Sequence, residues 1–348
     1  MSTGKDLKYL AVTLGDPGGI GMEIALKAAY GRGPAQLTLV LVGNPRLLSA
    51  QARRLRLPLP PAIGHPLDLR RAARRPMVYL WDPDNAQPGR ADRLAWRPGK
   101  TGRDYGRLSA AWVKAAVAGC QQGWFDGMVT APICKKSLAL AGLPFPGHTE
   151  YLAALTGVKD FAMMLIGGPL RVALATRHLP LARVPKALTT AGIVATAKLT
   201  ATALPWLTAG QPGRAALAIC ALNPHAGDGG LLGREEAEII APAVRRLRRA
   251  GLHVVGPVPA DVVFHQAARG DYGAVLAMYH DQGLGPLKTL AFDTGINLTL
   301  GLPIVRTSPD HGTAFDIAGR GVADARSMQA AIALANDLAR RPNPWRGK

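Results

Sequence analysis

The stretch Met278-Tyr279-His280-Asp281-Gln282-Gly283-Leu284-Gly285-Pro286-Leu287-Lys288 follows a short apolar run, residues 274–278, that is preceded by Gly273. A run of this kind is typical of a buried strand in an α/β protein. Because ligands bind at the carboxyl ends of strands in such sheets, we expect a functional site here. The stretch supplies an imidazole, a carboxylate, an amide and, after a predicted Gly/Pro turn, the ammonium group of Lys288.

Two further histidines stand just after apolar, strand-like runs. His178 lies in the segment A-T-R-H-L-P and His225 lies in N-P-H-A-G. Neutral imidazoles at strand ends suit Zn²⁺, Co²⁺, Mg²⁺ or another divalent ion that acts as a Lewis acid. The pattern predicts that His178, His225 and His280 bind one metal ion, although a lone histidine is more often an ordinary polar residue. His65, His253 and His265 are interpreted in that ordinary way.

Length and charge limit the possible classes of protein. The chain has 348 residues, 48% of them hydrophobic, which accommodates two domains at roughly 100–200 residues each. Its 42 Lys and Arg against 23 Asp and Glu give a net charge of +19, as found in proteins that bind nucleic acids, anionic membranes or anionic substrates. Scattered Arg pairs and 5% aromatic residues favour solvated helix faces, so a nucleic-acid-binding protein is the disfavoured alternative.

Cysteine usage and hydropathy bear on the compartment. The three cysteines are far apart and odd in number, which excludes a disulfide framework and a C-x-x-C motif. The sequence shows no secretory signal and no apolar stretch near the ~20 residues of a membrane span. We therefore expect a cytoplasmic protein without a membrane partner.

Strand and helix patterns alternate along the chain, which predicts a mostly parallel sheet with helices on both faces. Strands are expected at residues 9–14, 37–42, 77–81, 128–129, 161–166, 171–175, 216–222, 253–258, 274–278 and within 295–305. Helices are expected at residues 22–29, 45–55, 106–122, 135–140, from about 149, 190–207, 235–249 and 326–340. Residues 57–76 and 82–105 are expected to be loops. A hairpin at Gly167-Gly168 interrupts the βαβ series and indicates a second subdomain.

Two other motifs leave alternatives open. The glycine-rich segment 15–23, G-D-P-G-G-I-G-M-E, is either a tight strand-to-helix turn or a phosphate cradle at a helix N-terminus. His148-Thr149-Glu150 follows a Pro-rich loop, and Thr149 is either a substrate ligand or the N-cap of the next helix.

Several long motifs together resemble the PdxA family of 4-hydroxythreonine-4-phosphate dehydrogenases, which act in vitamin B6 biosynthesis. They are G-D-P-G-G-I-G at residues 15–21, A-G-L-P-F-P-G-H-T at 141–149, R-H-L-P-L at 177–181, L-N-P-H-A-G-D-G-G at 222–230, P-A-D at 259–261 and A-M-Y-H-D-Q-G-L at 277–284. The resemblance runs nearly end to end. The sequence departs from the usual family pattern after residue 284, where it reads G-P-L-K.

The resemblance implies a homodimer whose subunits have two α/β/α subdomains with a cleft between them, as in isocitrate and isopropylmalate dehydrogenases. Residues 1–144 with 308–348 would form the cofactor side, and residues 145–307 the metal, substrate and dimer side. His178, His225 and His280 match the family's metal ligands. The family's substrate-binding residues fall on His148, Thr149, Lys288, Asn297 and Arg306.

The implied activity is metal-dependent, NAD-linked oxidation of 4-phosphooxy-threonine, followed by decarboxylation to 3-amino-2-oxopropyl phosphate. Asp261 and Asp281 are candidates for orienting a histidine or accepting a proton, or they simply cap a strand end or helix. Close relatives act on D-threonate or D-erythronate 4-phosphates, and the cis-dihydrodiol carboxylate dehydrogenases form a more distant alternative.

The segment 310–321, D-H-G-T-A-F-D-I-A-G-R-G, resembles the loop with which isopropylmalate dehydrogenases hold the adenosine half of NAD. The resemblance places His311, Gly312, Thr313 and Asp316 at the cofactor. A carboxylate at Asp316 is expected to favour NAD over NADP, because it repels a 2′-phosphate.

Overall fold

The computed structural model describes residues 7–31, 33–34, 36–72, 77–83, 95–143, 145–209 and 216–347. The chain divides into two compact units, unit 1 with Met1–Val158 and Leu302–Lys348, and unit 2 with Lys159–Gly301. Unit 1 thus extends further at its first boundary than the expected residue 144, and it begins again before the expected residue 308. Helix α6 (His148–Thr156) belongs to unit 1, where the Tyr151 hydroxyl donates to the Ala110 carbonyl at 3.2 Å.

The sheet of unit 1 has the strand order β3-β4-β2-β1-β5-β12. Its strands are β1 (Lys8–Thr13), β2 (Leu37–Val42), β3 (Ala62–Ile63), β4 (Val78–Trp81), β5 (Gly127–Thr130) and β12 (Arg306–Pro309), and neighbours pair in parallel. The central strands are buried along almost their whole length, as expected for a parallel sheet covered on both faces. Thr13 and Thr130 lie side by side at the carboxyl ends of β1 and β5.

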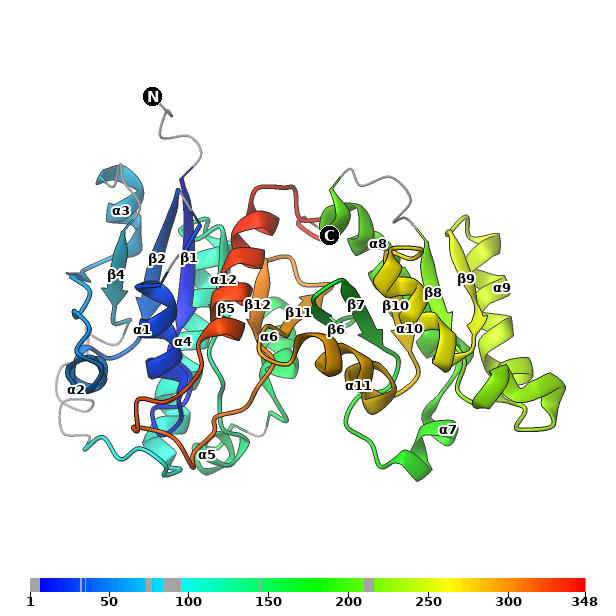
Figure 1. Cartoon of the computed structure of the whole chain (residues 1–348). Helices are drawn as coiled ribbons and strands as arrows, with labels where there is room; N and C mark the ends of the chain where they lie inside the picture. The colour runs from blue at the N-terminus through cyan, green and yellow to red at the C-terminus, as the bar shows by residue number, and fades with distance from the viewer. Residues whose placement is uncertain are drawn as a thin grey trace. The chain divides into compact units, whose positions relative to one another are not determined.

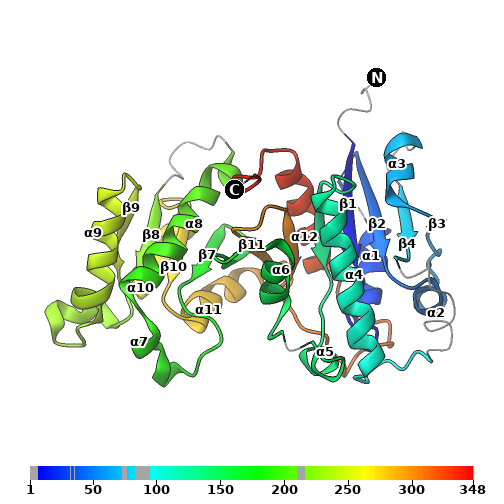
Figure 2. The ribbon, with the colours of Figure 1, turned by 180° about the vertical axis from the view of Figure 1, so that it is seen from behind.

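Helices cover both faces of this sheet: α1 (Gly21–Ala29) and α12 (Arg326–Ala339) on one, and α4 (Arg103–Gln121) on the other (Figures 1 and 2). The other helices of unit 1 are α2 (Pro45–Leu55), α3 (Pro66–Ala72), α5 (Lys135–Leu140) and α6. The side chain of Asn44 caps α2 by accepting from the backbone N–H groups of Arg46 and Leu47. The apolar side of α4 buries Trp112 completely, which anchors the helix on the sheet.

The sheet of unit 2 has the order β11-β6-β7-β10-β8-β9. Its strands are β6 (Ala162–Gly167), β7 (Leu170–Leu174), β8 (Leu217–Cys220), β9 (Val254–Val258), β10 (Ala274–Ala277) and β11 (Ile296–Leu300). The β6–β7 pair is the predicted hairpin, and β11 runs antiparallel to β6. Strand β10 lies between β7 and β8 and is parallel to both.

Helices α10 (Ala260–Arg269) and α11 (His280–Ala291) pack on one face of this sheet, where Val263, Phe264, Leu284 and Leu287 join the apolar core. The long helix α8 (Thr190–Thr208) covers the other face (Figure 2). The remaining helices are α7 (Val184–Ala187) and α9 (Ala241–Arg249), the latter preceded by a π-helical turn over Glu236–Ile240.

The predicted alternating α/β architecture is confirmed, with local differences. The expected loop at residues 57–76 contains β3 and α3, and α10 and β12 were not predicted. Residues 84–94 of the other expected loop lie outside the described residues, and α4 begins within it at Arg103. The predicted Gly/Pro turn before Lys288 is wrong, because Gly283, Gly285 and Pro286 are all inside helix α11. A Cβ on Gly283 would lie 2.6 Å from Val172 Cγ1, so close packing on β7 explains this glycine.

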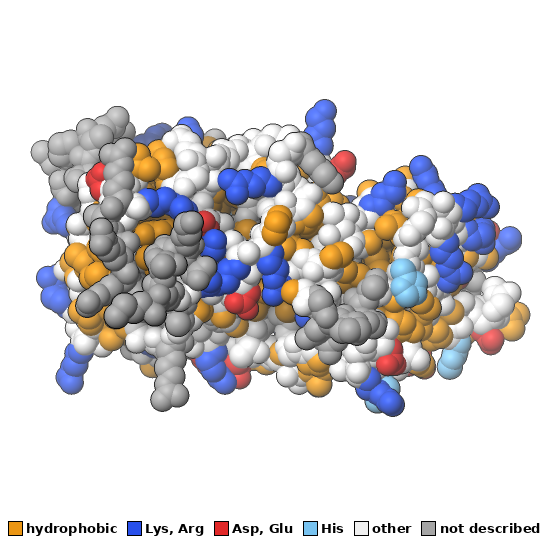
Figure 3. All heavy atoms as spheres, turned by 90° about the horizontal axis from the view of Figure 1, so that it is seen from above, with side chains coloured by type: hydrophobic (Ala, Val, Ile, Leu, Met, Phe, Trp, Pro, Cys, Tyr) orange, Lys and Arg blue, Asp and Glu red, His pale blue; other side chains and the backbone are white. Residues whose placement is uncertain are grey.

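On the face shown in Figure 3, the Lys and Arg side chains of the described residues lie at several separate places, with Asp and Glu side chains among them. Among the described helices, none is by itself long and apolar enough to cross a membrane. Only α8 taken together with Leu181–Ala187 reaches that length and composition, and a 93° bend separates the two.

The two glycines of α11 provide a stability test of the helix. Gly283→Ala should lower the free energy of unfolding by about 1–3 kcal/mol, because the new methyl group overpacks the contact with Val172. Gly285→Ala should raise it by roughly 0.5–1 kcal/mol, because no atom lies within 4 Å of its Cβ position and alanine favours the helix. Urea-induced unfolding measures both. Destabilisation by Gly285→Ala would mean that residues 283–286 form a turn.

Candidate functional site

Three neighbouring parallel strands of unit 2 place the three predicted metal-binding histidines at one edge of the sheet. His178 follows β7, His225 follows β8, and His280 begins α11 directly after β10. Since β10 is parallel to both neighbours, the three strands end at the same edge. Beyond the strands, the N–H groups of Ala175 and Thr176 donate to the carbonyls of Ala277 and Met278 at 2.9 and 3.2 Å. The segment that leads to His178 is therefore tied to the one that leads to His280.

Two of these histidines are in contact. The ring centroids of His178 and His280 are 5.4 Å apart. The Asp281 carboxylate lies 2.7 Å from His280 Nδ1, where it can accept a hydrogen bond from the Nδ1–H tautomer, in which Nε2 carries the lone pair. Within the described residues, no group of three or more His, Cys, Asp or Glu side chains is arranged to hold a metal ion, so the structure does not group His225 with this pair. Asp261 is exposed in the first turn of α10.

His225 lies in an unusual turn. Residues 225–229, which we call the left-handed turn, all have positive φ, and three of them (His225, Ala226 and Asp228) are not glycine. A left-handed conformation costs about 1–2 kcal/mol for each non-glycine residue, so neighbouring interactions must offset the strain.

The carboxylate of Glu236, which is 6% exposed, provides such interactions. Glu236 Oε1 accepts the N–H groups of Leu222 and Asn223 at 2.8 and 2.7 Å, and Oε2 accepts Asn223 Nδ2 at 2.9 Å. No sequence motif pointed to Glu236, because its role depends on the path of the preceding turn.

Unit 1 contains a separate candidate site around a buried arginine. Arg306 begins β12 and is 2% exposed, and its Nε and Nη2 both donate to Thr130 Oγ1 at 3.1 and 2.7 Å. Burial lowers the pKa of Arg306 to about 9, while the charge of Glu150 opposes that shift. Burial and the charge of Arg306 hold the pKa of His148 well below 6.5, so this imidazole is neutral. Thr130 was not predicted, although it stands at a strand end where such residues are expected.

His148 and Thr149 are the first two residues of α6, and Arg306 is close enough to His148 for its charge to act on the imidazole. The helix begins at His148 with Gly147 as its N-cap, so the alternative that Thr149 is the N-cap is wrong. The side chains of His148 and Arg306 therefore lie near a helix N-terminus, whose N–H groups and dipole favour anions.

Lys288 and Asn297 lie in unit 2. Lys288 Nζ is 5.6 Å from the centroid of the Phe292 ring one helical turn later. Asn297 is in β11 opposite Leu165 of β6. Lys288 is thus on helix α11 and Asn297 on strand β11, and both side chains are partly exposed.

The predicted cofactor loop, residues 310–321, connects β12 to α12 and is held at two points. At its front, the Ile20 N–H donates to the Thr313 carbonyl at 3.0 Å, and a Cβ on Gly19 would lie 2.9 Å from that carbonyl. At its end, the buried Glu23 carboxylate accepts the N–H groups of Gly321 and Ala323 at 3.3 and 2.7 Å. The glycine-rich segment therefore forms a tight turn that packs against this loop.

Three of the predicted site residues carry a buried polar atom that has no hydrogen-bond partner among the described residues: His148 Nε2, Asn297 Oδ1 and His311 Nε2. Thr13, Asp16, Thr38 and Trp112 carry the others. Buried polar atoms nearly always have a hydrogen-bond partner, so each exception requires an explanation. At His148, Asn297 and His311, a bound ligand that completes the hydrogen bond is a direct explanation.

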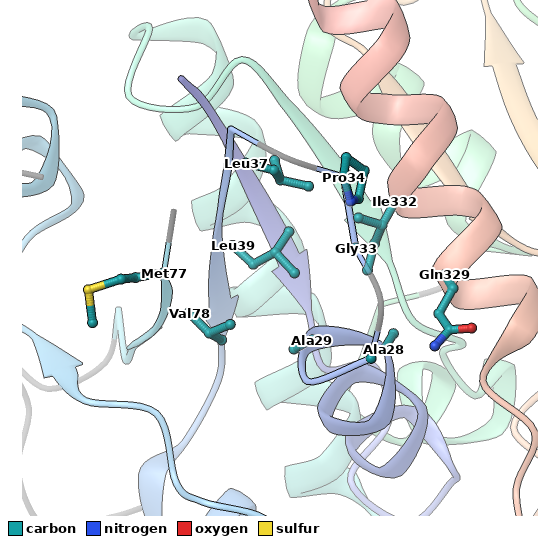
Figure 4. A pocket seen from close by; sticks show the side chains of 11 residues that line it. Ala28, Ala29, Gly33, Pro34, Leu37, Leu39, Met77, Val78, Gln329 and Ile332 are labelled. Carbon is teal, nitrogen blue, oxygen red and sulfur yellow. The ribbon is translucent and has the colours of Figure 1, made fainter. Parts of the chain in front are cut away.

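A hollow of about 200 Å³ in unit 1 lies away from these residues, where β2 and β4 begin (Figure 4). Its lining is mostly apolar, with Leu37, Leu39 and Ile332 among the side chains and Gln329 supplying an amide. None of the described residues that line it has a titratable side chain.

Comparison with known proteins identifies the family. The family model described as "Pyridoxal phosphate biosynthetic protein PdxA" matches residues 35–335 of this chain. The chain belongs to the PdxA family. A protein named 4-hydroxythreonine-4-phosphate dehydrogenase from Caulobacter vibrioides is 44% identical to this PdxA chain over 346 residues, 95% of this chain and 98% of the relative. A relative of the same name from Aromatoleum aromaticum is 46% identical over 341 residues, covering 95% and 97%.

Solved structures agree with this PdxA assignment. The crystal structure of 4-hydroxythreonine-4-phosphate dehydrogenase from Klebsiella pneumoniae matches with a TM-score of 0.85 and 39% identity over 96% of this chain and 99% of that one. A terephthalate 1,2-cis-dihydrodiol dehydrogenase from Burkholderia xenovorans matches with a TM-score of 0.63 and 29% identity over 95% and 98%. The resemblance and the α/β fold predicted from the sequence are confirmed.

The neutral state of His148 should be visible in the pH dependence of stability. Its folded-state pKa lies well below 6.5, so below that pH the unfolded chain binds a proton that the folded chain does not. As the pH is lowered below about 6.5, the free energy of unfolding should therefore decrease by up to about 1.4 kcal/mol per pH unit because of this residue. His148→Gln should remove this contribution to the pH dependence of the free energy of unfolding. His253→Gln, at an exposed position, should leave that pH dependence unchanged. If the free energy of unfolding changed with pH in the same way in the parent and in His148→Gln, the depressed pKa of His148 would be contradicted.

Proposed function

We propose that this PdxA protein oxidises 4-phosphooxy-threonine with NAD⁺ and decarboxylates the product to 3-amino-2-oxopropyl phosphate. Three histidines follow the ends of three adjacent parallel strands, and this arrangement is the main support for the proposal. The chain is also 44% identical to a protein named for this substrate. We assign the reaction to the cytoplasm, where reducing conditions suit the buried free cysteines Cys120, Cys134 and Cys220.

His178, His225 and His280 are the residues proposed to hold a divalent ion, with Zn²⁺, Co²⁺ and Mg²⁺ as candidates. The contact of the His178 and His280 rings fits this role because imidazole nitrogens are common ligands of divalent ions, and His225 follows the adjacent strand β8. When bound, the ion would supply Lewis acidity at the substrate's hydroxyl and carboxylate groups, while NAD⁺ would accept the hydride.

The chain's own residues then position the substrate and its protons. Asp281 fixes the tautomer of His280, because its carboxylate faces Nδ1 at 2.7 Å. Asp261, exposed at the beginning of α10, is the candidate acceptor for the proton of the substrate hydroxyl. The role of Asp261 follows from the need to remove that proton as hydride leaves, and the role of Asp281 follows from the need to orient a metal ligand.

Arg306, His148 and Thr149 are proposed to bind the substrate's anionic groups, together with Lys288 and Asn297. Arg306 is buried and its guanidinium is oriented by Thr130, so it meets an anion with little loss of side-chain freedom. Neutral His148 has Nε2 available for a hydrogen bond to the substrate.

Unit 1 is proposed as the cofactor side, with His311, Gly312, Thr313 and Asp316 at the adenosine half of NAD. The two attachments of the loop, at Ile20 and at Glu23, support this role because a dinucleotide needs a backbone of fixed shape. A homodimer is proposed from the family resemblance. The large apolar side chains of Leu181, Leu231 and Phe292, 66%, 85% and 75% exposed in unit 2, are consistent with an interface there.

Substrate specificity is tested by NADH formation with 4-phosphooxy-threonine, D-threonate 4-phosphate and D-erythronate 4-phosphate. We expect the highest kcat/KM for 4-phosphooxy-threonine. Arg306→Ala should raise the KM for that substrate by an amount equivalent to about 1.5–3 kcal/mol, the typical value for a charge-assisted hydrogen bond. Arg269→Ala, at an exposed position at the end of α10, is the matched control. An unchanged KM in Arg306→Ala would refute the anion site, and a higher kcat/KM for either sugar-acid phosphate would refute the substrate.

Cofactor preference tests the role of Asp316. The parent protein should have a higher kcat/KM for NAD⁺ than for NADP⁺, and Asp316→Ala should narrow the ratio because the carboxylate no longer repels a 2′-phosphate. Asp324→Ala removes a carboxylate that pairs with Arg326 after the loop and should leave the ratio unchanged. A parent enzyme that prefers NADP⁺ would exclude this function of Asp316.

A further inference from the structure

The left-handed turn that carries His225 lies against the buried carboxylate of Glu236. Glu236 binds the chain just before the turn, through the N–H groups of Leu222 and Asn223. It also packs against the middle of the turn, where a Cβ added to Gly227 would lie 2.8 Å from Glu236 Oε2. One buried side chain therefore contacts both the residues before the turn and the middle of the turn.

The backbone around Glu236 is specialised for this contact. Glu236 begins a π-helical turn, a rare feature that is frequent at functional sites. Glu235, which precedes it, accepts Asn223 Nδ2 at 2.8 Å, so Asn223 is held by two carboxylates. The backbone of the turn closes on itself through the Leu232 N–H and the Gly227 carbonyl at 3.1 Å. In contrast, the side chain of Glu238 in the same segment is 57% exposed and pairs with Arg234 on the surface.

We infer that Glu236 is a positioning residue for the metal site: its carboxylate keeps residues 225–229 left-handed and thereby fixes the direction of the His225 side chain. The inference rests on the proposed function, in which His225 is a metal ligand. Without the carboxylate, the three strained non-glycine residues of the turn relax toward right-handed conformations, and His225 no longer points in one direction. Substitution of a residue that orients a metal ligand without binding the metal itself typically weakens metal affinity by about 10–100-fold.

The test measures Zn²⁺ affinity of the metal-free full-length protein by competition with a chromophoric chelator, a readout that is independent of activity. Glu236→Ala should weaken Zn²⁺ binding by about 10–100-fold, whereas Glu238→Gln should bind like the parent. Glu236→Gln keeps an acceptor for the Leu222 and Asn223 N–H groups but turns an amide toward Asn223 Nδ2, so its affinity should be intermediate. Thermal unfolding in the chelator confirms that each variant is folded.

A second pair of variants leaves Glu236 in place and covers the case in which Glu236→Ala does not fold. Gly227→Ala puts a methyl group against the carboxylate and should weaken Zn²⁺ binding about as much as Glu236→Ala. Gly229→Ala is the control, because Gly229 also has positive φ but no atom lies within 4 Å of its Cβ position. Its affinity should stay close to that of the parent.

His225→Ala distinguishes a failure of the proposed metal site from a failure of the role given to Glu236. If His225→Ala leaves Zn²⁺ affinity unchanged, the proposed metal site is wrong. If His225→Ala weakens binding but Glu236→Ala and Gly227→Ala do not, the metal site stands and the role of Glu236 is refuted. Equal losses in Gly227→Ala and Gly229→Ala would also refute it, because the effect would then come from the glycines and not from the carboxylate.

Discussion

The parallel pairing of β10 with both β7 and β8 is the constraint on which the candidate metal site depends. Each of the three strands is followed within a few residues by a histidine, and only parallel neighbours bring such residues to one edge. The strands themselves are buried and apolar, so their register is fixed by the core and not by the histidines. The chemistry is thus carried by short segments whose positions the core determines.

A buried glutamate supports a functional loop in each unit. In unit 1, Glu23 accepts backbone N–H groups at the end of the segment proposed to hold the cofactor, and Lys27 binds the carbonyls of Gly321 and Ala323 beside it. In unit 2, Glu236 does the same for the turn that carries His225. A carboxylate can accept several N–H groups at once and forms strong, charge-assisted hydrogen bonds, which suits it to holding irregular backbone.

The sequence predicted the regular elements well, because buried parallel strands and amphipathic helices have clear hydrophobic patterns. It failed where tertiary contacts decide the structure. Gly283, Gly285 and Pro286 look like turn residues, yet they are inside α11, where packing against β7 overrides local preference. The strand ends and their histidines were predictable, and so was the family. Thr130 and Glu236 were not, because their partners Arg306 and Asn223 come close to them only in the folded chain.

The discontinuity of unit 1 has a consequence for how the chain is made on the ribosome. Strand β12 pairs with β5, and α12 packs over the same sheet, but both are synthesised only after the whole of unit 2. Until they emerge, β5 has no partner strand on the side where β12 will pair, and α1 lacks the second helix of its face of the sheet, which leaves backbone groups and apolar side chains open to aggregation. Unit 2 is continuous and has all its strands before that point. The N-terminal part of this protein is therefore synthesised first but can complete its sheet only last. A nascent chain arrested before residue 306 should bind chaperones that recognise exposed apolar segments.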